Sequence, residues 1–341
     1  MSQPEGIFVS VTRPTSSTTS AWLRPSLLLI LFCVHAALVP SHDASAQSKT
    51  RPRTAAAATT AAQVSAKSIT VRTEPKSVVW LDEVRRGVTD DAGQIVLNNV
   101  ASGRHTLRVR AGGFTERTLA LLPSQRSAIE VRLTRTNDEA ELAFQKAEAA
   151  SEKPGEEARA EAVKLYRRAI ELRPRHAAAH LGLARVLLAM NDHDAALAAV
   201  AAARRARPVY PEASAVEGRI HRDASYNDEA VASYGRAIRE GRGFQPEAHT
   251  GLGLVLEDKG DYEGAVKAFR KAIEQLSDTE PVLYNLIGAA YEKLERWKDA
   301  LAAYEKYLQL APEGRNASAI RSIIDQLRVQ AAEQQQQTPP D

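Results

Sequence analysis

From Asp138 onward, hydrophobic residues recur every three or four positions, which is the spacing of amphipathic helices. The stretch 261–276, DYEGAVKAFRKAIEQL, is representative, with one apolar stripe formed by Tyr262, Ala265, Val266, Phe269, Ala272, Ile273 and Leu276. Two members of this stripe are alanines, and small side chains on an apolar stripe indicate that a second helix lies very close. The pattern therefore predicts a pair of closely packed helices.

The stripe repeats along the chain. Alanines equivalent to Ala265 follow one another at steps of 34 or 35 residues, and they are Ala162, Ala196, Ala230 and Ala300. Four positions later stands a large apolar residue, namely Tyr166, Val200, Tyr234, Phe269 and Tyr304. An upstream helix carries its own small column, formed by Ala184, Gly218, Gly253 and Gly288. We expect small residues of the two helices to face each other, with the large residue reaching the next pair.

The segment 281–312, PVLYNLIGAAYEKLERWKDALAAYEKYLQLAP, resembles the tetratricopeptide repeat, a helix–turn–helix of 34 residues. The shared columns are Tyr284, Ile287, Gly288, Tyr291, Ala300, Tyr304 and Pro312. The resemblance implies a mainly α, multidomain protein with an α-solenoid of five repeats, spanning 138–174, 177–208, 211–246, 247–280 and 281–312. Neither helix of a repeat can bury its apolar face alone, so the stacked repeats form the core.

Details of the repeats predict how they begin and end. Pro174, Pro208 and Pro312 are expected to end second helices, with Pro246 and Pro281 doing so after slightly longer loops. Polar turns such as NDHD (191–194) supply aspartates that can cap second helices. Repeat three has Glu217 and His221 in apolar columns, so we expect looser packing there. A capping helix is predicted over 315–331, followed by a disordered tail over 332–341.

Upstream of the repeats, the hydrophobic period changes to two. Apolar and polar residues alternate in SITVRT (68–73), HTLRVRA (105–111) and AIEVRLT (128–134), and SVVWL (77–81) and QIVL (94–97) complete about six short strands. Residues 67–135 are therefore predicted to form a small all-β sandwich. This region resembles the PEGA module and the related carboxypeptidase-regulatory-like sandwiches, through Pro75, Val79–Asp82, a turn at Gly87–Thr89, and Gly103–Phe114. The resemblance implies an adhesive or spacer unit.

The N-terminal segment has the layout of a secretory signal peptide. An apolar run, SLLLILFCVHAALV (26–39), follows Arg24 and precedes small residues at 44–46. We expect residues 1–46 to be removed after Ala46, with an uncleaved membrane anchor as the alternative. Residues 47–66, rich in alanine and threonine, are predicted to be a disordered linker. Cys33 is the only cysteine and lies in the run, so the mature chain would form no disulfide, as is typical of a bacterial envelope or periplasm.

Composition excludes some functions. Of 341 residues, 44% are hydrophobic and 5% aromatic, which suits alanine-rich helix packing, and a net charge of +3 is too small to indicate nucleic-acid binding. His176 and His180 are spaced like a helical zinc pair, but the glutamate of a zinc protease and a third ligand are missing, so a solvated helix start is the preferred interpretation. We find no phosphate loop or catalytic triad, and we expect no enzyme activity, cofactor or metal.

The remaining candidate for function is the surface of the repeats. Solenoids bind partners along the face made by their first helices. The residues expected to line that groove are Leu181, Arg185, Leu188, Arg219, Arg222, Leu254, Glu257, Asn285 and Glu292. The arginines would suit an acidic or carboxylate-ended peptide, and the leucines an apolar segment. The alternative for the arginines is ordinary solvation.

Two hypotheses follow for the whole chain. The first is an exported, non-enzymatic scaffold that binds a protein or peptide in the groove during assembly of an envelope complex. The second is a cell-wall or surface adhesion protein, whose basic β-sandwich binds an anionic glycan while the repeats act as a spacer. A third, an accessory domain of another enzyme, would require a catalytic partner.

Overall fold

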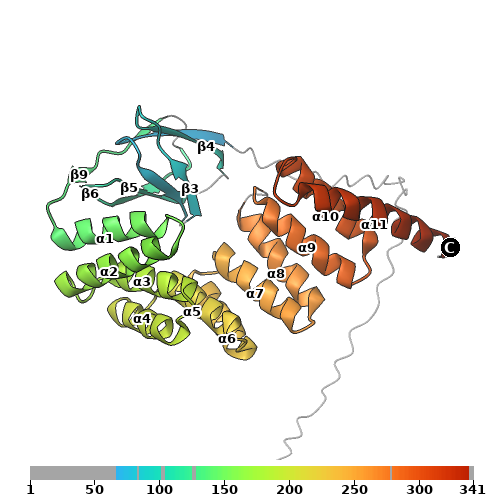
Figure 1. Ribbon diagram of the computed structural model, residues 1–341. Helices are drawn as coiled ribbons and strands as arrows, with labels where there is room; N and C mark the ends of the chain where they lie inside the picture. Colours follow the sequence, from blue (N-terminus) through green and yellow to red (C-terminus); the bar gives the residue numbers. More distant parts are fainter. Residues whose placement is uncertain (1–66, 83, 101–103, 125–127, 277–278, 338–341) are drawn as a thin grey trace, which may run out of the picture. The chain divides into compact units, whose positions relative to one another are not determined.

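The computed structural model describes residues 67–82, 84–100, 104–124, 128–276 and 279–337. The expected signal peptide (1–46) and linker (47–66) lie outside the described residues. Within them, nine strands are followed by eleven helices, which confirms a mainly α protein with a small β region (Figure 1).

The β region contains two main sheets and one short ribbon. One sheet has the order β4-β1-β8, with β8 parallel to β1; the second is antiparallel with the order β3-β2-β5-β7; and β6 pairs with β9. Residues from both main sheets form one buried cluster that includes Ile69, Val79 and Leu107. The strands are β1 (Lys67–Arg72), β2 (Val78–Leu81), β3 (Val84–Val88), β4 (Gln94–Val100), β5 (His105–Arg110), β6 (Phe114–Thr115), β7 (Arg117–Leu121), β8 (Ile129–Glu130) and β9 (Thr134–Arg135).

The nine strands differ from the predicted set of about six in several places. Gly87 was expected to begin a turn, but it lies within β3 and pairs with Val79 on β2. The chain turns after Thr89, whose hydroxyl accepts a 2.8 Å hydrogen bond from the backbone N–H of Ser77. The edge strand β7 was missed, because its polar residues are exposed. The predicted strand over 128–134 is divided: Ile129–Glu130 form β8, which pairs with β1, and Thr134 begins β9, which pairs with β6.

Eleven helices make up the rest of the described chain, and they pack as successive pairs (Figure 1). None of them is long and apolar enough to cross a bilayer. The pairs are α1 (Glu139–Ser151) with α2 (Glu156–Leu172), α3 (Ala177–Ala189) with α4 (His193–Ala206), α5 (Pro211–Asp223) with α6 (Asn227–Glu240), α7 (Pro246–Asp258) with α8 (Tyr262–Gln275), and α9 (Pro281–Lys293) with α10 (Trp297–Leu310); α11 (Ala317–Gln337) follows.

Two predictions about helix ends are wrong. Pro246 and Pro281 do not end helices but occupy the first turn of α7 and α9, where the missing N–H has no partner to lose and the fixed φ favours the helix. The tail predicted to be disordered from 332 instead continues α11 as far as Gln337, because alanine and glutamine are good helix formers. The predicted caps are confirmed: Asp192 and Asp261 accept hydrogen bonds from the backbone at the starts of α4 and α8.

Close packing of the repeats depends on glycines that face aromatic rings. A Cβ at Gly218 would lie 2.8 Å from the ring of Tyr234 in the same repeat, and one at Gly251 would lie 2.2 Å from the same ring. Tyr234 therefore fills the space between the first helices of repeats three and four. The small column of the first helix accommodates the aromatic residue of the second helix, rather than its alanine as we expected.

Candidate functional site

The nine residues predicted to line a groove all lie on first helices of repeats two to five. They are distributed as Leu181, Arg185 and Leu188 on α3, Arg219 and Arg222 on α5, Leu254 and Glu257 on α7, and Asn285 and Glu292 on α9. They differ in solvent exposure, since Leu181 and Leu188 are buried and Arg185 and Arg219 are exposed. The structure places them along the whole array and does not gather them into one pocket.

The two leucines of α3 differ from the prediction. Leu181 and Leu188 are only 2% and 5% exposed, because α3 is apolar almost all round and packs into the core on several sides. Leu188 therefore stabilises the fold and presents little surface to a partner, and Leu181 only borders a pocket. Arg185 is exposed on the same helix.

The arginines of α5 share one acidic neighbour. Arg222 lies 3.0 Å from Asp223, and Arg219 lies 3.8 Å from the same carboxylate. Both pairs are local and partly exposed, so they hold the side chains only weakly. Arg219, whose side chain is 58% exposed, remains accessible to a partner.

A cavity of about 380 Å³, here named the front pocket, lies where the β region meets the first repeats. Strand residues contribute Trp80 and Arg110, and helices contribute Glu148, Arg185 and Tyr210. Arg110 reaches from β5 to Glu148 on α1 at 2.8 Å. The pocket therefore combines side chains that are far apart in the sequence, and it includes Arg185 from the predicted groove.

Charged and aromatic side chains are paired around the front pocket. The guanidinium of Arg108 lies 4.2 Å from the centre of the Trp80 ring, and that of Arg207 lies 4.5 Å from the Tyr210 ring. Burial, reinforced by Glu212, raises the pKa of Tyr210 to about 12, so this phenol is neutral at ordinary pH. Arg185, by contrast, has no hydrogen bond or ion pair within the described residues. It is an exposed cation in the lining of the front pocket.

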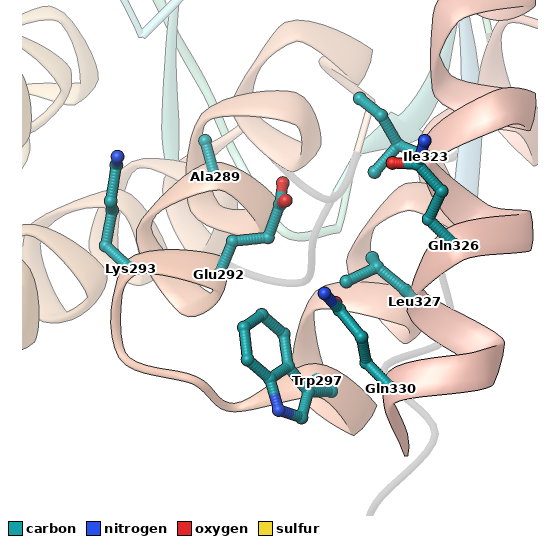
Figure 2. Close-up of a pocket in the computed structure, with 8 residues that line it drawn as sticks. All are labelled: Ala289, Glu292, Lys293, Trp297, Ile323, Gln326, Leu327 and Gln330. Carbon is teal, nitrogen blue, oxygen red and sulfur yellow. The ribbon is translucent and has the colours of Figure 1, made fainter. Parts of the chain in front are cut away.

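A second cavity, here named the C-terminal pocket, has a volume of about 320 Å³ and lies between the last repeat and α11. Figure 2 shows Glu292 from α9 beside the ring of Trp297, facing side chains of α11, with Lys293 directed to one side. The carboxylate of Glu292 accepts a hydrogen bond from the hydroxyl of Tyr304, which fixes its orientation. The α11 wall consists of Ile323, Gln326, Leu327 and Gln330.

The C-terminal pocket contains functional candidates that sequence analysis missed. Gln326 and Gln330 are four residues apart, which places both amides on one face of α11. Amides can donate to and accept from a peptide backbone, while the partly exposed Ile323 can contact its apolar side chains. The signal in the sequence was a pair of glutamines beside the apolar face of the capping helix; in the structure both are exposed, and Trp297 is partly exposed.

The histidine pair considered as metal ligands has two separate structural roles. His176 caps α3 by accepting from the N–H of Ala179, and its ring packs on Phe144 at 4.8 Å. It is therefore mostly buried, unlike the solvated helix start we expected. The His180 Nε2 atom lies 2.9 Å from the carbonyl oxygen of Pro174. Among the described residues, no group of three potential metal ligands forms.

Sequence models of one family match the helical region. Models described as tetratricopeptide repeat match residues 155–220, 215–281 and 281–313. The first helix of repeat one precedes these matches. No curated protein matched the sequence.

Several solved structures are similar to this chain at low identity. TTC0263, a tetratricopeptide-repeat protein of Thermus thermophilus, is 19% identical over 56% of this chain and 99% of its own, with a TM-score of 0.46. The pilF protein of Pseudomonas aeruginosa is 18% identical over 58% and 89%, with a TM-score of 0.49. YrrB, described as having an unusual peptide-binding site, is 20% identical over 55% and 94%, with a TM-score of 0.41.

The family matches agree with the helix pairs and with the glycine–aromatic contacts between them. The third match, 281–313, covers the pair α9 and α10, whereas the first begins at α2 and ends within α5, and the second begins within α5 and ends at the start of α9. Residues 155–313 are therefore tetratricopeptide repeats, and the helices form a solenoid of such repeats after a small β-rich region.

Proposed function

We propose that this protein is a non-enzymatic scaffold that binds a segment of a partner protein along the first helices of its repeats. One observation carries the proposal: the front and C-terminal pockets both border first helices, at opposite ends of the repeat array. Arg185 lines the first pocket and Glu292 the second, and both residues were expected on the binding face. Tetratricopeptide repeats bind partners on such extended surfaces.

The chemistry of the pockets suggests what the partner segment carries. Arg185 offers an exposed guanidinium, so an acidic side chain or a C-terminal carboxylate suits the front pocket. The amides of Gln326 and Gln330, next to apolar side chains, suit an extended peptide backbone in the C-terminal pocket. A partner that contacts both pockets gains affinity through the second contact, because that contact is then intramolecular.

The ionisable groups in the pockets support recognition rather than catalysis. Glu148 accepts hydrogen bonds from Arg110 and from the hydroxyl of Tyr166, and Glu292 accepts one from Tyr304. Burial, together with these carboxylates, raises the pKa values of both tyrosines, so their hydroxyls stay protonated donors. The carboxylates are thus occupied as structural acceptors.

We further propose that the chain is exported and acts in assembly of a bacterial envelope complex. The support is the apolar run at 26–39, flanked by Arg24 and by the small residues at 44–46. N-terminal sequencing of the protein from its native host tests this step. A mature chain that begins at Gln47 in the envelope fraction is expected, and an intact N-terminus in the cytosolic fraction would contradict it.

Photo-crosslinking tests the binding face. A benzophenone amino acid is placed at Arg219 or Lys293, both exposed on first helices, and at Lys267 on the second helix α8 as the control. Discrete crosslinked proteins are expected from the first two positions and not from Lys267. Equal crosslinking from all three positions, or none from any, would refute the proposal.

The alternative is a surface adhesion protein whose PEGA-like sandwich binds an anionic glycan. Its basic residues are partly engaged, since Arg108 lies 3.3 Å from Glu116 and Arg110 lies 2.8 Å from Glu148. Two substitutions on the sandwich, Arg85→Glu and Arg117→Glu, discriminate the hypotheses. Loss of envelope binding with intact crosslinking from Lys293 would favour adhesion, and retained envelope binding would favour the scaffold.

A further inference from the structure

The contact between repeats two and three, where α4 packs beside α5, has an unusual composition. Three of its positions are apolar in the other repeats and polar here. Arg204 occupies the column of Ile170, Ile238, Ile273 and Leu308. Glu217 occupies the column of Leu183, Leu252 and Ile287, and His221 that of Leu187, Leu256 and Tyr291. All three changes meet at one contact, here named the seam.

The first two polar residues of the seam point to partners on α5 and α6. Arg204 binds Glu240 at 3.0 Å, and the hydroxyl of Ser214 donates to the same carboxylate at 2.8 Å. Glu217 binds Arg236 at 2.6 Å. Paired, hydrogen-bonded charges are tolerated in a partly buried contact. These side chains therefore satisfy one another and do not fill the space that aliphatic side chains fill elsewhere.

A hollow of about 610 Å³ remains in the seam. This volume lies within the range of roughly 300–1,000 Å³ that is typical of ligand pockets. Its apolar wall is formed by Leu197, Val200, Ala201 and Pro208. The hollow is therefore large enough for a side chain of a partner together with part of the neighbouring backbone.

One accessible charged group lines the hollow, beside a partly buried histidine. Arg205 lines the hollow, is exposed, and has no hydrogen bond or ion pair within the described residues. The Nδ1 atom of His221 is buried and has no hydrogen-bond partner in that same part of the chain. Because Arg204 and Glu217 are neutralised by their own partners, Arg205 gives the hollow a positive rim.

We propose that the seam hollow is a second binding site, which takes a peptide segment of a partner protein with an apolar side chain next to a carboxylate. The apolar side chain contacts Leu197, Ala201 and Pro208. The carboxylate pairs with Arg205. The apolar wall and Arg205 belong to the second helix α4, so substitutions there leave Arg219 and Lys293 of the first helices unchanged.

Binding of synthetic peptides to the full chain tests the proposal. The probes are three fluorescein-labelled, C-terminally amidated peptides, Gly-Leu-Asp-Gly, Gly-Leu-Lys-Gly and Gly-Ser-Asp-Gly, measured by anisotropy. Arg205→Glu reverses the rim charge, and its control is Arg239→Glu, an exposed arginine in the same column on α6. Ala201→Phe fills the hollow from an exposed helix position, and its control is Ala232→Phe on α6. Circular dichroism checks that each variant is folded.

The Leu-Asp peptide is expected to bind more tightly than the other two. Arg205→Glu should weaken it by at least about fivefold, because a charge-assisted contact is lost, and Ala201→Phe should weaken it similarly. Both α6 controls should bind like the unmodified chain. Equal binding of the three peptides, no binding of any, or equal losses in variant and control would overturn the proposal. So would a change in sedimentation mass in Ala201→Phe with unchanged peptide binding, since a second copy would then occupy the hollow.

Discussion

A single methyl group at Gly251 is predicted to destabilise the repeats, although alanine is the better helix former. The ring of Tyr234 lies between Gly218 and Gly251 and is only 2% exposed. In Gly251→Ala, the new Cβ would lie 2.2 Å from Cζ and 2.4 Å from Cε1 of this ring. A Cβ at Gly218 would also lie 2.8 Å from this ring, so the ring is close to the backbone of both first helices and has little room to move.

Two effects of opposite sign decide the outcome. Replacing glycine by alanine within a helix stabilises by about 1 kcal/mol. Overpacking a well-packed core costs about 1–3 kcal/mol. The upper part of that range applies here, because the ring is buried and confined on both sides. We therefore expect Gly251→Ala to lower the free energy of unfolding by about 1–2 kcal/mol net.

Urea unfolding followed by circular dichroism measures the change, with Gly235→Ala as the matched control. Gly235 also lies in a helix, but its added Cβ would meet only the end of the flexible Arg239 side chain, at 3.4 Å. The control should therefore be more stable by up to about 1 kcal/mol. Combining Gly251→Ala with Tyr234→Leu should recover most of the overpacking cost. If Gly251→Ala is stabilised as much as the control, the ring does not confine this position and the reasoning fails.

Two further predictions concern polar contacts. Gln145→Ala removes two hydrogen bonds to the backbone of the β region, at Gly113 (2.9 Å) and Phe114 (2.7 Å). The β region should therefore become easier to cleave in limited proteolysis. The control Gln309→Ala, at an exposed position, should leave the cleavage unchanged. Burial opposes ionisation of Glu240, but hydrogen bonds from Arg204 and Ser214 prevail and hold its pKa below the ordinary 4.5. The stability that ionised Glu240 contributes is therefore present above pH 4.5 and is lost as the pH falls through the folded-state pKa. The urea midpoint of Glu240→Gln should then vary less between about pH 5 and 3 than that of the unmodified chain. Equal dependence of the two midpoints on pH would contradict this.

Periodicity was sufficient to predict the helices, because each repeat places small residues and a large apolar residue in the same columns. It was less informative at helix ends. Pro246 and Pro281 follow second helices at a distance, and their position alone does not distinguish a residue that ends one helix from a residue that begins the next. Edge strands such as β7 carry exposed polar residues, so the alternation that identifies a half-buried strand is weak there.

The sequence patterns did not predict the pockets. The front pocket combines Trp80 and Tyr210, whose proximity is a consequence of tertiary packing between the β region and the repeats. Leu188 was assigned to the groove from its column, yet α3 is packed on several sides and buries it. The polar residues Glu217 and His221 were the exception, because their departure from apolar columns already indicated where packing would be incomplete.

The buried tyrosine rings provide an absorbance signal for the unfolding of individual repeats. Burial is the main cause that raises the pKa of Tyr166, Tyr234 and Tyr304 well above the ordinary 10.0, so these phenols remain neutral in folded repeats at a pH where an unfolded chain would ionise them. Their stabilising effect is complete below about pH 10 and is lost as the pH rises through the folded-state pKa. Phenolate absorbance would thus appear as each repeat opens. Since the three rings belong to repeats one, three and five, single Tyr→Phe substitutions would assign the absorbance changes to positions along the solenoid, and would show from which end it unravels.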